Sequence, residues 1–165
     1  MKRIGLALAA AGVVSVSGIG GGVASAAGPY ESVTGAIKRT HLTTGPDVHF
    51  VVSAHDGPNG AFGTYHATHG QGKSRLEYDA RVVCLRVDGN LASVGVQVTS
   101  SELALWPVGT YHTIRVIDNG NPASGAPSDV MSPSASQATP VTCDSTRSFT
   151  QTTQITGNVL VKDGS

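Results

Sequence analysis

The side chains best suited to chemistry in this sequence are histidines, of which three fall close together along the chain. His66 and His69 are separated by two residues, and His55 precedes them across a turn-rich segment. Imidazole nitrogens are common ligands of zinc and copper. A zinc or copper site of His55, His66 and His69 is therefore the sharpest metal hypothesis. Histidines scattered over surface loops explain the same positions, and we favour this second interpretation and expect no cofactor.

A second candidate cation site consists of the oxygen donors Asp118, Asn119 and Asp129. Calcium binds carboxylate and amide oxygens arranged around a loop. The segment lacks the ligand spacing of an EF-hand loop, however, and Asx hydrogen bonds to the backbone account for the same residues. We therefore expect a polar turn here and keep calcium as the alternative.

Motifs of the common hydrolases and nucleotide-binding enzymes are absent from the sequence. It contains no G-x-S-x-G elbow, no H-E-x-x-H segment, no P-loop and no Rossmann fingerprint. Glu77 and Asp79 alternate along one strand-like run and could flank a sugar, but a solvated strand face accounts for them. No catalytic residue is predicted, and we favour a protein that is not an enzyme.

The two cysteines, Cys84 and Cys143, are predicted to form a disulfide. An even pair in an oxidising compartment is most simply paired. Closing a loop of about 60 residues stabilises a chain by about 4 kcal/mol in the chain-entropy model. A free catalytic thiol is the alternative, but Cys84 lies in a strand-like run with no histidine beside it.

The start of the chain predicts the oxidising compartment. Two positive charges precede an apolar stretch over residues 4–16, and Ala24-Ser25-Ala26 matches an A-x-A cleavage site. Glycine and serine interrupt the apolar stretch, which argues against a membrane anchor. We expect a signal peptide over residues 1–26 that is cleaved near Ala26 or Ala27, and a single secreted β domain over residues 27–165.

The charge of the expected mature chain argues against a nucleic-acid partner, and its hydropathy argues against a membrane span. Two of the 11 basic residues lie in the leader, so the mature part has two more acidic than basic residues. A chain without excess positive charge has little to neutralise phosphates, so we expect no nucleic-acid partner. No long apolar span follows the leader, so we expect no membrane span once the signal is removed.

Short runs of alternating apolar and polar residues predict an all-β fold. A period of two with one apolar face is typical of half-buried antiparallel strands. Asp88-Gly89-Asn90 joins two such runs as a tight hairpin would, and a strand that begins near Gly157 is expected to pair with the N-terminal strand. The predicted fold is an antiparallel meander that forms a small closed or nearly closed β-barrel, with a β-sandwich as the alternative. The apolar positions expected to share one face within their runs are Val48, Phe50 and Val52; Val83, Leu85 and Val87; Val94, Val96 and Val98; Ile114 and Val116; and Val159 and Val161.

Three aromatic residues are candidates for lining a barrel mouth, namely Phe62, Trp106 and Tyr111. A small barrel is either packed solid or holds one small ligand. Residues 101–106 are expected to form a helical turn or a loop that packs Trp106 on the mouth. Ordinary core or rim packing explains the three aromatic residues as well, and we favour it.

Three motifs carry a resemblance to a known group of proteins. Residues 83–90 are similar to a "VTCLxVxGN" hairpin, residues 116–129 to "VxDNGxxxxPD", and residues 155–161 to "ITxGNxxV". Their order resembles a group of small exported proteins, mostly actinobacterial, with no assigned activity. The resemblance implies export and a closed or nearly closed antiparallel β fold, and it implies no catalytic residue. Ser128 separates Pro127 from Asp129, where the group has an adjacent pair.

These observations predict a secreted, non-catalytic binding or cell-envelope-associated module, whose partner is a small apolar ligand or an extracellular protein. One alternative is an exported hydrolase with an unrecognised site of histidine and aspartate. Another is a protease inhibitor that presents the Pro-, Ser- and Ala-rich loop over residues 121–140.

Overall fold

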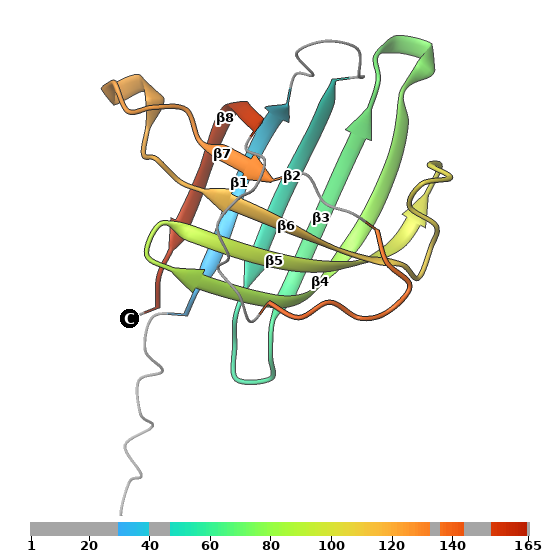
Figure 1. Cartoon of the computed structure of the whole chain (residues 1–165), viewed down its shortest axis with the longest axis horizontal. Coiled ribbons are helices and arrows are strands. Elements are labelled where there is room, and N and C mark those ends of the chain that lie inside the picture. The colour runs from blue at the N-terminus through green and yellow to red at the C-terminus, as the bar shows by residue number, and fades with distance from the viewer. Residues whose placement is uncertain (1–29, 40–46, 133–135, 144–152, 165) are drawn as a thin grey trace, which may run out of the picture.

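The computed structural model describes residues 30–39, 47–132, 136–143 and 153–164 (Figure 1). The predicted signal peptide lies outside these residues, so its cleavage stays a prediction. Within the described ranges, no helix is long and apolar enough to cross a membrane.

The described chain is all-β, as predicted. Two 3-10 turns, η1 (Gly72–Ser74) and η2 (Pro122–Ser124), are the only helical elements in the described segments. Ser101 ends the fifth strand, and residues 102–106 form turns and bends, not a helix. The strands are β1 (Ser32–Arg39), β2 (Val48–His55), β3 (Phe62–His69), β4 (Leu76–Asp88), β5 (Leu91–Ser101), β6 (Tyr111–Ile117), β7 (Val130–Ser132) and β8 (Thr153–Lys162).

The eight strands form one antiparallel meander. Each strand pairs with the next, and β8 returns to pair with all of β1 (Figure 1). The ladder is weakest at β7, which pairs over three positions with β6 and over two with β8. The sheet is therefore curled into a half-barrel, and paired strands do not fully close its wall. One continuous ladder agrees with the predicted meander and not with the sandwich alternative.

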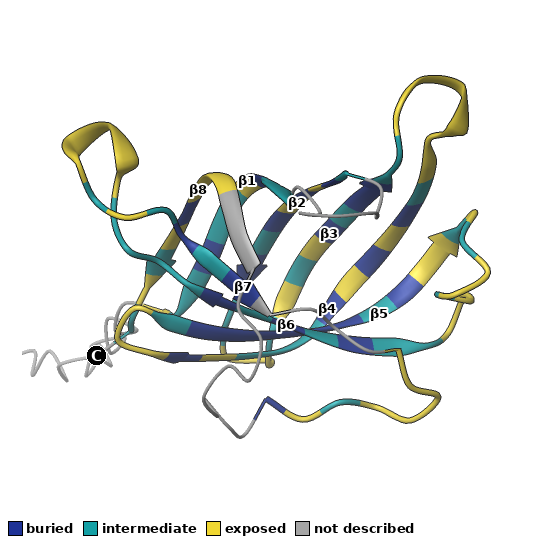
Figure 2. Ribbon diagram, turned by 45° about the horizontal axis from the view of Figure 1, so that its top comes forward, coloured by how far each residue is buried: buried dark blue, intermediate teal, exposed yellow. Residues whose placement is uncertain are grey.

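Buried residues alternate with less buried ones along β2 to β4, as the colours of Figure 2 show. Val48, Phe50 and Val52 are buried, whereas His49 and Val51 between them are exposed. The same alternation buries the predicted faces of β5 and β6, and on β8 it buries Val159 and leaves Val161 partly buried against the core. Because large side chains from almost every strand meet inside, the described interior is a packed core.

A β-bulge corrects the predicted face of β4. Val82 pairs with Val96 and Cys84 pairs with Gly95, so Val83 is the extra residue. Val82 therefore belongs to the core, together with Val87 and the partly buried Leu85, whereas Val83 does not. A bulge re-aims the side chains that follow it. Here the bulge places Cys84 opposite Gly95.

Cys84 and Cys143 form the predicted disulfide. The disulfide anchors the segment 136–143, whose Gln137 also exchanges two backbone hydrogen bonds of 2.8 Å with Tyr111 at the start of β6. Gly95 makes room for this anchor, because a Cβ there would collide with the sulfur of Cys84 and the side chain of Val141.

Candidate functional site on the outer face

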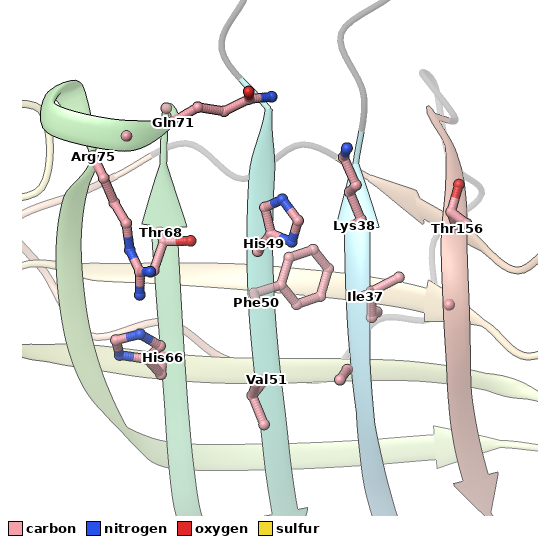
Figure 3. Close-up of a pocket in the computed structure, with 14 residues that line it drawn as sticks. Ile37, Lys38, His49, Phe50, Val51, His66, Thr68, Gln71, Arg75 and Thr156 are labelled. Carbon is pink, nitrogen blue, oxygen red and sulfur yellow. The ribbon is translucent and has the colours of Figure 1, made fainter.

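A groove of about 650 Å³ lies on the outer face of β1, β2 and β3, between the β3–β4 turn and β8 (Figure 3). Its floor follows from strand alternation, because outward residues of paired strands stand side by side. Ala36 of β1 pairs with Val51 of β2, and His49 of β2 pairs with Thr68 of β3. At the β8 edge, Gly157 has a φ of 119°, and a Cβ there would collide with the backbone of Ala36. Glycine therefore allows β8 to lie close against this end of β1.

One side of the groove is held by Lys38 and Gln71. The Nζ atom of Lys38 lies 2.9 Å from Oδ2 of Asp47. The side-chain amide of Gln71 donates to the same oxygen at 2.7 Å. These two hydrogen bonds, that of Lys38 first, hold the pKa of Asp47 below its usual value. The carboxylate thus joins the ends of β1 and β2 to the β3–β4 turn.

The other side of the groove centres on His66. Its Nδ1 atom lies 2.8 Å from Oδ1 of Asp79, and its Nε2 atom lies 4.0 Å from Oε2 of Glu77. The other oxygen of Glu77 lies 2.7 Å from the guanidinium of Arg75. Because an ionised carboxylate only accepts hydrogen bonds, Asp79 keeps the proton of His66 on Nδ1. Glu77 and Asp79 share the outer face of β4, as the sequence indicated.

The three histidines of the metal hypothesis do not come together. His66 points to the outer face, whereas the ring of His69 packs against Tyr78 and Trp106 at the end of the core. His55 lies four residues beyond Val51, the cross-strand partner of His66, and hydrogen-bonds to Ser53. In the described part of the chain, no group of three or more metal-ligating side chains is placed to hold an ion.

The residues of the calcium hypothesis do meet, but their carboxylates are occupied by backbone N–H groups. Asp129 is fully buried and accepts from Asn119 N at 2.9 Å and from Val159 N at 2.8 Å. Asp118 accepts from Gly120 N and from Val161 N, at 2.8 and 2.9 Å. These carboxylates therefore link the β6–β7 loop to the β8 edge where β7 is too short to pair. The arrangement is the polar turn that we favoured from the sequence.

Replacing Asp129 by asparagine tests this structural role. The amide side chain would keep one acceptor oxygen and turn an NH₂ group towards a backbone N–H. We expect Asp129→Asn to lower the free energy of unfolding by about 2 kcal/mol, the scale of one hydrogen bond to a charged group. Urea unfolding measures the change. Melts of the natural protein with calcium and with a chelator should coincide, and a calcium-dependent shift would restore the metal hypothesis.

The three predicted mouth residues lie in different places. Trp106 packs at the end of the core and stacks on Tyr78, with ring centroids 5.4 Å apart. Phe62 begins β3 at the opposite end, where its exposed ring stacks on His55. The hydroxyl of Tyr111 accepts a hydrogen bond from Gln97 on the outer face. Trp106 and Phe62 therefore lie at opposite ends of the sheet and Tyr111 lies on its outer face, so the three residues do not line one mouth.

A buried cluster around His112 was missed from the sequence. Its ring is fully buried and lies edge-on to Tyr65 and Tyr78, with centroids 5.6 Å away in each case. The Tyr78 hydroxyl donates to that of Tyr65 at 3.3 Å, and burial raises the pKa of Tyr65 to about 12. Neither ring nitrogen of His112 has a hydrogen-bond partner among the described residues. Alternation with Ile114 and Val116 was the available signal for its burial.

The loop of the inhibitor hypothesis is described except for residues 133–135. Its first part contains η2, capped by the side chain of Asn121, and the short strand β7. Its second part includes the Gln137 bridge to β6. The inhibitor hypothesis stays a prediction.

Two cations of the groove, Lys38 and Arg75, were also missed, because they lie 37 positions apart in the sequence and no local pattern relates them.

The chain matches no known family model, no curated protein and no solved structure.

Proposed function

We propose that the mature chain is an exported, non-catalytic binding module that takes a small molecule in the outer-face groove. The observation that carries the proposal is the groove itself, since ligand pockets commonly measure about 300–1,000 Å³ and combine apolar surface with a few polar groups. Ala36 and Val51 supply the apolar floor, and His49, His66 and Thr68 supply polar groups. The packed core favours recognition on the outer face over carriage inside.

A groove-filling variant tests the proposal. Val51 is 52 % exposed and lies in the groove, whereas Leu160 is 59 % exposed on the outer face of β8 and does not line it. A mixed small-molecule screen by NMR first identifies a ligand. Val51→Phe should then weaken the binding of that ligand about tenfold or more, because the added ring occupies the floor of the groove. Leu160→Phe is the matched control and should bind normally. The proposal would be contradicted if ligands changed the chemical shifts of other residues but not those of His49, His66 and Thr68.

An exported hydrolase is the second candidate, and the contact between His66 and Asp79 favours it. A carboxylate that fixes the histidine tautomer is the usual partner of a general base. However, no hydroxyl or thiol within the described residues is hydrogen-bonded to His66. A panel of ester, peptide and glycoside substrates decides between the two functions: turnover that disappears in His66→Gln would establish the enzyme.

A further inference from the structure

The titratable side chains of the groove are all basic. Among the described residues that line it, Lys38, His49, His66 and Arg75 are the ionisable ones, and none is acidic. The nearest carboxylates, Asp47, Glu77 and Asp79, contact these bases but are not part of the lining. The ionisable groups that can contact a bound molecule are thus basic, although the neighbouring carboxylates offset part of their charge.

Three of the four bases each contact a carboxylate that does not line the groove. Asp47 holds Lys38 at 2.9 Å, Glu77 holds Arg75 at 2.7 Å, and Asp79 holds His66 at 2.8 Å. An ammonium has three donors and a guanidinium has five, so each cation keeps donors for a ligand after its carboxylate is satisfied. Lys38 and Arg75 are 40 % and 52 % exposed, so a ligand can reach both. Supporting carboxylates of this kind orient binding side chains.

The middle of the groove contains a hydroxyl that a ligand can reach. Thr68 is only 6 % exposed, and its hydroxyl forms no hydrogen bond to another described residue. Figure 3 shows this hydroxyl directed along the groove towards β2, between Arg75 on one side and Lys38 on the other. Because this oxygen is open to the groove, it can donate a hydrogen bond to a bound molecule.

We propose that the ligand of the groove is a small organic anion with an acidic group at each end, one bound by Lys38 and the other by Arg75. This inference rests on the proposed function and names the ligand class of the same site. Lys38 lies on β1, and Arg75 lies directly before β4 with its side chain directed back towards Thr68 on β3 (Figure 3). The two anchors are thus about two strand spacings apart, which is roughly 10 Å. The chain between the acidic groups crosses Val51, and the Thr68 hydroxyl donates a hydrogen bond to an oxygen of the acidic group that Arg75 binds. Either carboxylate or phosphate fits this chemistry, because both accept from lysine and arginine.

A matched ligand series tests the charge requirement. Suberate carries two carboxylates, its monomethyl ester carries one, and suberamide carries none at the same length. In NMR titrations at low salt, each lost charge should weaken binding by about tenfold, the scale of one hydrogen bond between charged groups. Succinate is too short to bridge and should bind like a monoanion. Hexanediol bisphosphate in the same series distinguishes a preference for phosphate from one for carboxylate.

Protein variants test the two anchors. Lys38→Gln and Arg75→Gln should each weaken the binding of suberate about tenfold and leave the binding of suberamide unchanged. Lys73→Gln removes an exposed charge two residues from Arg75 that does not line the groove, and should leave suberate binding unchanged. Equal binding of suberate and suberamide at the groove would overturn the anion inference but keep the proposed function. Failure of the whole series and of the mixed screen would overturn both.

Discussion

Replacing Cys84 and Cys143 together by alanine is expected to lower the free energy of unfolding by about 4 kcal/mol. The disulfide joins residues 59 positions apart, so its loss frees a long loop in the unfolded chain. Typical domains have only about 5–15 kcal/mol of stability, so this single change removes a large share of it. Urea unfolding of the natural protein and of the double variant, followed by circular dichroism, measures the difference.

The natural protein in excess reductant is the matched control for the double variant. Both lack the cross-link, but only the variant lacks the two thiols, so coincident unfolding curves would assign the effect to the bond itself. A difference below about 1 kcal/mol between oxidised and reduced protein would contradict the expectation. In that case the remaining contacts of segment 136–143, such as the Tyr111 and Gln137 pair, would hold the segment in place.

The features of the fold that sequence predicted are those with a local or compositional signal. Alternation identified the buried faces of β2, β5, β6 and β8, because a strand turns successive side chains to opposite sides. The hairpin at Asp88-Gly89-Asn90 and the pairing of β8 with β1 were also predicted. The bulge at Val83 was not, because an extra residue leaves the apolar composition of the run unchanged.

The histidine spacing shows where sequence could have done better. Residues 66 and 69 are separated by an odd number of positions, which places them on opposite faces of a regular strand. The proposed metal site was therefore disfavoured by the strand prediction itself. The contact between His66 and Asp79, in contrast, depends on the register of β3 against β4. Register is set by the whole sheet, so sequence spacing alone does not give it.

Lowering the pH from about 6.5 to about 4 is expected to cost the fold about 3 kcal/mol through His112 alone. Burial lowers the pKa of His112 from 6.5 to about 4 in the folded protein. Between these two pH values, His112 is protonated in the unfolded chain and neutral in the folded protein. Stability is therefore fully present above pH 6.5 and is lost as the pH falls towards 4, with no further contribution from His112 below that.

His112→Leu isolates this contribution. Leucine is apolar and cannot titrate, so the variant should lose less stability than the natural protein over the same pH range. Since both ring nitrogens of His112 are buried without a partner among the described residues, the variant should also be at least as stable at pH 7. Urea unfolding of both proteins at several pH values gives the two slopes. Parallel slopes would show that other groups cause the acid sensitivity, and marked destabilisation at pH 7 would show that His112 makes a favourable interaction in the folded protein.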